Sequence, residues 1–280
     1  MKSVYMVMHQ QKPNMRELAG RVAGAFHRAG IALFAESWLY KLTQDIQPPL
    51  FDGCTMEGCE AVIAVGGDGT LLRANALALE RDLPLLGVNI GRVGFLAEVE
   101  MDQLDEACEA LKANAFTVES RMMLRVDMEG HTALALNDVV LSRGVYARLI
   151  GVDAWVGSDP IGHFMADGLI VSTPTGSTGY SLSAGGPIVC PEVECMVLTP
   201  ICAHSLQHRP VVTSASQPVS IRLDGEDVEA VVSVDGQDTF PFRSGQRLNV
   251  TRSNRSARFI RLQPKSFFSK IRIKLSEWSC

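Results

Sequence analysis

Ala61-Val62-Ile63-Ala64-Val65-Gly66-Gly67-Asp68-Gly69-Thr70-Leu71-Leu72-Arg73-Ala74 is the stretch that decides the fold. Its first five residues are small or β-branched and apolar, which predicts a buried strand, and the residues from Leu71 predict the opening of a helix. Glycines between a strand and a helix leave free backbone N–H groups at the positive end of the helix, where phosphate binds. We therefore expect a phosphate-binding loop formed by Gly66, Gly67, Gly69 and Thr70.

Asp68 adds a carboxylate that plain phosphate-binding loops lack. Beside phosphates, a carboxylate can hold a magnesium ion or accept a proton from an attacking hydroxyl. The structural alternative is a tight strand-to-helix turn in which Asp68 only caps the helix. We favour the chemical interpretation.

The first hundred or so residues alternate between strand and helix patterns. Asn14 and Glu17 have the spacing of a capping box before a helix that Gly30 ends. Strands are expected at 3–8, 31–35, 61–65 and 85–88, and further helices near Leu71 and at 102–113. This order predicts a Rossmann-like α/β domain with a parallel sheet. Ligands of such sheets bind at the carboxyl ends of the strands, where the glycine loop lies.

From about Phe116 the helical periodicity nearly disappears, and short strands separated by turn residues replace it. Strands are expected at 121–128, 133–141, 151–156, 219–223, 228–234 and 247–251. The pattern predicts an all-β second domain at 116–262, after an α/β domain at 1–115. A helix is expected between Lys265 and Trp278, and segment 263–280 is expected to pack back on the first domain.

Composition limits the classes of partner. The 280 residues are 46% hydrophobic and 20% charged with a net charge of −5, so no overall field attracts nucleic acid or anionic membranes. The chain has no run of about 18 apolar residues, so no membrane span is expected. The apolar stretch at its start is too short for a signal peptide. Seven cysteines without a CxxC pair favour free thiols in a reducing cytoplasm. His204 and His208 lack an evident third ligand, so no residues are assigned to a metal.

Two further polar segments stand out. Asn137-Asp138 interrupts an apolar run, which fits either a β-bulge or an amide and carboxylate aimed at the hydroxyl pair of a ribose. The segment Asp167–Pro187 is rich in hydroxyl residues and glycine, which suits a sugar–phosphate ligand, and Tyr180 could stack on a base. The chain has neither a Walker A lysine motif nor a G-x-G-x-x-G fingerprint, which excludes P-loop enzymes and ordinary NAD-dependent dehydrogenases.

Together these segments resemble bacterial NAD kinases, in the same order and at similar spacing. Leu86 to Asn89, Gly94-Phe95-Leu96, Pro200 to Pro210 and Asp235-Gly236-Gln237 also match, so the resemblance covers essentially the whole chain. The glycine–aspartate loop is shared with phosphofructokinases and with diacylglycerol and sphingosine kinases. The hydroxyl-rich segment is more specific to NAD kinases.

The resemblance implies transfer of the γ-phosphoryl group of ATP to the 2′-hydroxyl of the adenosine ribose of NAD, with Mg²⁺ or another divalent metal. It makes Asp68 the proton acceptor and implies a homodimer or homotetramer. The residues it assigns to the dinucleotide or to phosphates are Gly66, Gly67, Gly69, Thr70, Arg73, Asn137, Asp138, Arg148, Asp167, Thr178, Gly179, Tyr180, Ser181, Leu182, Ser183 and Gln237.

Two positions depart from the family pattern, and two other functions stay open. Gly179 stands where alanine is common, and Met165 stands where many relatives have arginine, for which Arg148 or His163 could substitute. One alternative is a non-catalytic NAD(P)-binding sensor, against which the intact Asp68 argues. The other is a lipid or sugar kinase sharing the loop, which would leave Asp167–Pro187 unexplained.

Overall fold

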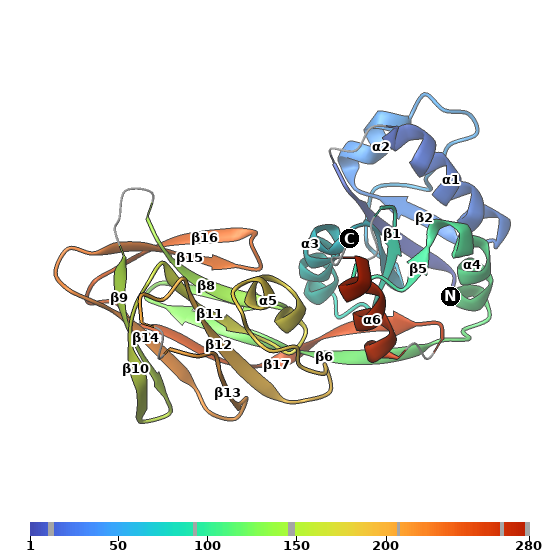
Figure 1. Cartoon of the computed structure of the whole chain (residues 1–280). Coiled ribbons are helices and arrows are strands. Elements are labelled where there is room, and N and C mark those ends of the chain that lie inside the picture. The colour runs from blue at the N-terminus through green and yellow to red at the C-terminus, as the bar shows by residue number, and fades with distance from the viewer. Residues whose placement is uncertain (11–13, 92–93, 145–148, 206–207, 264–265, 278–280) are drawn as a thin grey trace. The chain divides into compact units, whose positions relative to one another are not determined.

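The computed structural model describes residues 1–10, 14–91, 94–144, 149–205, 208–263 and 266–277 (Figure 1). The chain forms two compact units, Met1–Ser120 with Ala257–Cys280 and Arg121–Ser256. It changes unit inside two long strands, β6 (Thr117–Met128) and β17 (Leu248–Arg261). Because strand periodicity continues across both points, the sequence pattern has no break there. Arg148, one of the expected cofactor ligands, lies outside the described residues.

The first unit alternates strands and helices around a parallel sheet in the order β4-β3-β1-β2. The short strand β5 pairs in parallel with the end of β4. The C-terminal part of β17 also pairs with β4, through Phe259 and Leu85. The predicted Rossmann-like domain is confirmed. Its elements are β1 (Ser3–Met8), α1 (Met15–Arg28), β2 (Ala32–Ala35), α2 (Ser37–Thr43), β3 (Ala61–Gly66), α3 (Asp68–Glu80), β4 (Leu85–Asn89), β5 (Val99–Glu100), η1 (Met101–Gln103), α4 (Leu104–Lys112) and α6 (Phe267–Glu277).

Burial explains why the central strand reads as an unbroken apolar run. Every residue of β3 is buried, because β1 and β4 pair with it on both edges and helices cover the sheet. Helix α1 contributes a stripe that includes Val22 and Phe26, both fully buried. These side chains share one core with Met6 and Ile63 of the sheet.

Three local features differ from the sequence expectation. The capping box is wrong: Asn14 has a left-handed φ of 63°, and its side chain makes no cap hydrogen bond. Helix α2 was not expected, because seven residues are too few to establish a helical period. Helix α3 begins at Asp68 rather than near Leu71, so the glycine motif is itself the helix N-terminus.

The second unit is antiparallel, and the predicted all-β domain is confirmed. One sheet has the order β13-β12-β11-β8-β15-β16, and other strands pair as β10-β9-β14-β17 and β6-β7. Its elements besides β6 and β17 are β7 (His131–Ala135), β8 (Asp138–Arg143), β9 (Ile150–Val156), β10 (Asp159–Ala166), β11 (Gly168–Ser172), η2 (Gly176–Thr178), α5 (Tyr180–Ser183), β12 (Cys195–Ile201), β13 (Val211–Ser214), β14 (Val219–Asp224), β15 (Glu229–Val234) and β16 (Asp238–Arg243).

The expected single strand at 133–141 is wrong, since the chain breaks between β7 and β8 at Leu136-Asn137. The break turns the Asn137-Asp138 pair into the entry of a buried strand. Both strands still contribute to a core shared with Val152 and Phe242, β7 through Ala135 and β8 through Val139 and Leu141. Apolar periodicity alone did not reveal the break, because residues on both sides of it are buried.

Candidate active site

The glycine loop connects β3 to α3 and leaves room for a ligand. Gly67 precedes the first helical residue, so the loop forms the N-terminus of α3, where the Thr70 N–H donates back to the Gly67 carbonyl at 3.0 Å. A side chain on Gly67 or Gly69 would meet nothing within 4 Å. Gly66 is different, because a Cβ there would lie 2.2 Å from Oγ1 of the buried Thr70. The loop therefore packs tightly at its β3 end and is open at its helix end.

The Asp68 carboxylate is oriented by the backbone that follows β4. Its Oδ2 accepts a hydrogen bond from the Phe95 N–H at 3.1 Å, and its Oδ1 accepts one from the Leu96 N–H at 3.3 Å. Gly94 lies so close that a Cβ would be 2.2 Å from Oδ1. The carboxylate is thus held in one place by two donors and by a neighbour that must be glycine.

Arg73 lies one helical turn beyond the loop, as expected, but its guanidinium is engaged elsewhere. It forms an ion pair with Glu36, which is 9% exposed, and donates to the Met8 carbonyl at 2.6 Å. Glu36 also accepts the Met8 N–H at 3.2 Å. No local sequence pattern indicates this pairing, because Glu36 lies 37 positions from Arg73.

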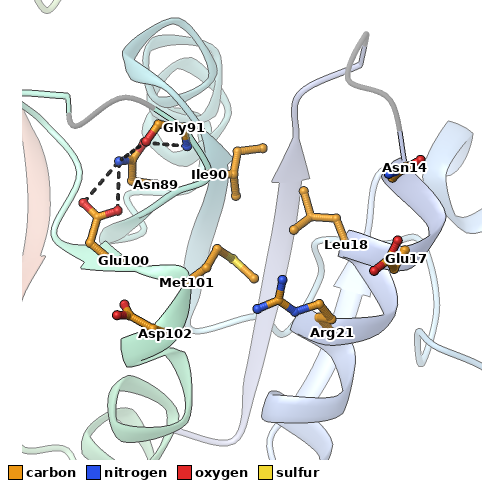
Figure 2. Close-up of a pocket in the computed structure, with 10 residues that line it drawn as sticks. All are labelled: Asn14, Glu17, Leu18, Arg21, Asn89, Ile90, Gly91, Glu100, Met101 and Asp102. Atoms are coloured by element: carbon orange, nitrogen blue, oxygen red, sulfur yellow. Dashed lines mark hydrogen bonds between the residues drawn. The ribbon is translucent and has the colours of Figure 1, made fainter.

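A cavity of about 800 Å³ opens at the carboxyl edge of the same sheet (Figure 2). Asn89 at the end of β4 pairs in register with Gly66, so the cavity begins next to the glycine loop. The Asn89 side chain donates to the Glu100 carboxylate at 3.0 and 3.1 Å. The lining residues are Asn14, Glu17, Leu18, Arg21, Asn89, Ile90, Gly91, Glu100, Met101 and Asp102.

The cavity combines apolar walls with carboxylates and one cation. Figure 2 shows the Arg21 side chain reaching from α1 toward Met101. Arg21 makes no hydrogen bond or ion pair with any residue that the structure describes. The volume falls in the range of small-molecule sites, and the carboxylates of Glu17 and Asp102 suit hydroxyl or amino groups better than phosphate.

In the second unit, Asp235 builds the turn between β7 and β8. Its carboxylate accepts the N–H groups of Leu136 at 2.8 Å, Asn137 at 2.7 Å and Asp138 at 3.1 Å. From the sequence, Asp235-Gly236 is expected as a turn between strands and as part of the family resemblance, and Asp235 itself has no assigned role. The sequence signal at this position is the Asp235-Gly236 dipeptide, which is typical of a turn. In the structure the turn follows β15, and Asp235 has a positive φ of 51°. Asp235 thereby fixes the backbone that presents Asn137 and Asp138.

Asp138 is 6% exposed, and burial raises the pKa of its carboxyl to about 7, with the Asp235 charge adding to the rise. Burial also raises the pKa of Asp235, which the three N–H donors oppose. The Asn137 Oδ1 is buried and has no hydrogen-bond partner. A buried acceptor without a partner is costly, so this amide is the kind of group that a ligand satisfies.

The hydroxyl-rich segment packs beside this turn, but most of its hydroxyls serve its own structure. Thr173 donates to the Leu136 carbonyl at 2.6 Å, Thr178 donates to Thr175, and Ser181 pairs with Thr199 in the interior. Gly179 lies next to Asn137 and Asp138. A Cβ at position 179 would be 3.9 Å from both the Asn137 Nδ2 and an Asp138 carboxylate oxygen. Alanine at this position would therefore make only ordinary contacts with the pair.

The remaining expected residues include Asp167, which precedes β11 at the end opposite to the pairing of Ser172 with Asp138. Tyr180 is 47% exposed on α5, followed by Leu182 and the exposed Ser183. Asp167 accepts a hydrogen bond from the Arg143 Nε at 2.7 Å, and Gln237 is exposed in the turn after Asp235. The structure thus brings together Asn137, Asp138 and Gly179, with Asp235 behind them.

Across the described residues, no group of three His, Cys, Asp or Glu side chains could hold a metal ion. His208 packs against the Phe164 ring at 4.8 Å instead. The six cysteines that the structure covers are free. No described helix is long and apolar enough to cross a membrane.

Comparison with known proteins identifies what the chain resembles. The model of the ATP-NAD kinase N-terminal domain matches residues 5–116, and that of the C-terminal domain matches residues 136–262. An NAD kinase of Moorella thermoacetica is 38% identical over 99% of this chain and 90% of its own length. One of Heliobacterium modesticaldum is 39% identical over 99% of both chains.

Solved structures agree with this similarity. A yeast NADH kinase complexed with NADH has a TM-score of 0.88 at 23% identity, covering 99% of this chain and 88% of the other, and so shows the fold. An NAD kinase of Archaeoglobus fulgidus in complex with ATP has a TM-score of 0.73 at 26% identity, covering 97% of this chain and 99% of the other.

Proposed function

The chain belongs to the ATP-NAD kinase family, and on that premise we propose which of its groups carry out the reaction. The enzyme transfers the γ-phosphoryl group of ATP to the 2′-hydroxyl of the adenosine ribose of NAD, giving NADP. Phosphoryl transfer needs little covalent chemistry from the protein. It depends on alignment and on stabilising charge.

We propose that Asp68 accepts the proton of the attacking ribose hydroxyl. The observation that supports this role is the carboxylate held at the N-terminus of α3 by the N–H groups of Phe95 and Leu96. A general base must keep a fixed position within hydrogen-bond reach of its proton. As the hydroxyl oxygen bonds to the γ-phosphorus, ADP leaves and the proton passes to Asp68.

The N-terminus of α3 is proposed to bind phosphate oxygens of the nucleotide, because the positive end of a helix dipole favours an anion. No lysine or arginine of the loop adds charge, because Arg73 is paired with Glu36. The residues fit a divalent metal that arrives with ATP, since Mg²⁺ is commonly held by substrate phosphates, water and one or two carboxylates. When bound, such a metal would neutralise the phosphate charge, and Asp68 would be the carboxylate that helps to hold it.

The cavity in Figure 2 is proposed to take the nucleoside end of ATP. It starts beside Gly66, its walls at Leu18, Ile90 and Met101 are apolar, and its carboxylates suit ribose hydroxyls. The Arg21→Met variant should raise the KM for ATP about fivefold to tenfold, with kcat and the KM for NAD within about twofold, since a lost polar contact costs on the order of 1 kcal/mol.

The matched control for Arg21 is Arg16→Met on the same helix, because Arg16 pairs with Asp45 on the surface and does not line the cavity. Steady-state kinetics at varied ATP and saturating NAD give the comparison. An unchanged KM for ATP in the Arg21 variant would remove the nucleoside from this cavity.

Asn137 and Asp138 are proposed to bind a ribose of NAD, with Gly179 and Tyr180 beside them. The unpartnered Asn137 Oδ1 and the Asp138 carboxyl supply hydrogen-bonding groups for a hydroxyl pair. Asp235 keeps both in place through their backbone N–H groups. The other expected residues, Asp167, Thr178, Ser181 to Ser183 and Gln237, remain proposed ligands of the dinucleotide.

The experiment that tests the role of Asp68 is NADP formation from NAD, ATP and magnesium, followed with an NADP-specific dehydrogenase. The Asp68→Asn variant should lower kcat by roughly 100-fold to 10,000-fold, the range for losing a general base. Its KM values and its binding of NAD in calorimetry should stay close to those of the wild type. A folded Asp68→Asn protein with near-normal kcat would contradict the assignment.

A cytoplasmic location and a homo-oligomeric state are also proposed. Free thiols at all six described cysteines suit a reducing compartment. The oligomer follows from the family resemblance alone. Sedimentation equilibrium would show the assembly, and a monomer at working concentration would contradict it.

A further inference from the structure

We propose that Lys270 and Arg261, near the C-terminal end of the chain, position the Asp68 carboxylate through the backbone of residues 95–97. This inference rests on the proposed role of Asp68. Lys270 lies on α6 and Arg261 ends β17, far along the sequence from the glycine loop. Both belong to the same compact unit as Asp68.

The first link is the pair of N–H groups that hold Asp68. Phe95 and Leu96 donate to the two carboxylate oxygens. These two peptides lie in the loop between β4 and β5 and take part in no regular secondary structure. The position of the carboxylate therefore depends on what holds this loop.

The second link is on the carbonyl side of the same loop. The Lys270 Nζ donates to the Ala97 carbonyl at 3.1 Å, and an Arg261 guanidinium nitrogen donates to the Leu96 carbonyl at 3.4 Å. Leu96 thus donates to Asp68 with its N–H and accepts from Arg261 with its carbonyl. The two bonds involve adjacent peptide groups, so Arg261 restrains the peptide that follows the one bonded to Asp68.

The third link fixes the two cations. The side chain of Glu98 is 2% exposed and lies 3.2 Å from Arg261 and 3.8 Å from Lys270. Glu119 pairs with the other side of the Arg261 guanidinium. Glu98 is the most buried member of this ion-paired cluster, and removing one cation would leave its carboxylate under-compensated.

The backbone of Glu98 anchors the network to the sheet. Its N–H donates to the Gly87 carbonyl of β4 at 3.0 Å. A Cβ on Gly87 would lie 3.0 Å from the Ala97 Cα, so the loop packs directly on the strand. Residues 97 and 98 are thus already packed on β4 without the two cations. We therefore infer that Lys270 and Arg261 control the orientation of the peptide groups of residues 95–97.

A double-mutant cycle tests the proposal. Lys270→Met in the wild-type enzyme should lower kcat roughly 10-fold to 100-fold, the effect of misplacing a catalytic group by about 1 Å. The KM values for ATP and NAD should stay within about twofold, and in an Asp68→Asn background the same change should lower kcat less than about twofold. Lys270→Arg, which keeps a cationic donor, should restore kcat to within about threefold of the wild type.

The matched control is Arg272→Met on the same helix, because Arg272 is exposed and makes no hydrogen bond or ion pair with residues 95–98 in the part of the chain that is described. It should leave kcat unchanged in both backgrounds. If Lys270→Met does not fold, judged by circular dichroism, Arg261→Lys provides the second arm. That variant shortens the reach to the Leu96 carbonyl and should show the same dependence on Asp68.

The two possible failures are distinguishable. If Asp68→Asn alone leaves kcat unchanged, the proposed proton acceptor is wrong. If Asp68→Asn lowers kcat but Lys270→Met lowers it further by its full wild-type factor, the cation does not act through Asp68. A raised KM with unchanged kcat in Lys270→Met would also overturn the positioning role.

Discussion

At the scale of the residue, the second unit places two carboxyl groups, Asp138 and Asp235, where water does not reach freely. Asp235 is compensated by three N–H donors, whereas Asp138 accepts no hydrogen bond from a described residue. A buried carboxyl without donors favours its neutral form, which is why the Asp138 pKa rises to about 7. In that form it can donate a hydrogen bond to a sugar hydroxyl.

The raised pKa predicts how stability depends on pH. The native state keeps the Asp138 proton up to about pH 7, whereas the unfolded chain releases it near the ordinary carboxyl pKa of 3.8. Its stabilising contribution is complete below that value and is lost as the pH rises through about 7. The wild type should therefore lose up to about 4 kcal/mol relative to Asp138→Asn between pH 4 and 8.

Thermal unfolding of both proteins across this pH range measures the effect. Asp159→Asn, an exposed change in the same unit, is the control and should follow the wild type at every pH. Parallel curves for wild type and Asp138→Asn would contradict the raised pKa.

At the scale of the element, Arg73 joins three segments of the first unit. Its guanidinium belongs to α3, bonds to the last residue of β1, and pairs with Glu36, which precedes α2. Glu36 is the more buried partner, so the pair holds an otherwise uncompensated charge rather than adding a surface contact. This arrangement fixes the angle at which α3 leaves the glycine loop.

Removing Arg73 should therefore cost stability more than substrate binding. Arg73→Met should lower the free energy of unfolding by about 2–4 kcal/mol, because the Glu36 charge stays buried. Adding Glu36→Gln should recover part of this loss. Urea denaturation measures both, with Arg28→Met as the control, since its pair with Asp105 is exposed and is worth about 0–1 kcal/mol.

The same variant decides between two roles for Arg73. The sequence-based expectation, a contact with phosphates, would give a raised KM for ATP and an unchanged midpoint of urea unfolding. The structural pairing predicts the opposite result.

At the scale of the whole molecule, the two units differ in how the chain forms them. The second unit is one continuous segment, Arg121–Ser256, with its own apolar core, whereas the first is closed by residues from both ends of the chain. A continuous segment with a core of its own is the description of an independent folding domain.

A fragment spanning residues 121–256 should consequently fold alone. We expect antiparallel β-structure in circular dichroism and a single cooperative thermal transition. The fragment should form no NADP, because Asp68 is absent from it. A gradual transition without a baseline would show that this unit needs the rest of the chain; the full-length protein is the reference.

The sequence by itself determined the features that are local along the chain. Fourteen adjacent residues, 61–74, predict the buried strand, the glycine loop and the start of the helix after it. The change from helical to strand periodicity near Phe116 likewise gave the two fold classes, and the ordered motifs identified the family. Such signals survive in sequence because period, turn residues and apolar runs depend on neighbouring positions.

The tertiary structure alone decided what holds the reactive groups. Phe95 and Leu96 reach Asp68 from 27 and 28 positions away, Asp235 reaches Asn137 from 98, and Lys270 reaches Ala97 from 173. Glu36 forms an ion pair with Arg73 from 37 positions away. A hydrogen bond across such distances leaves no periodic trace at either residue, because only the path of the folded backbone brings its donor and acceptor together.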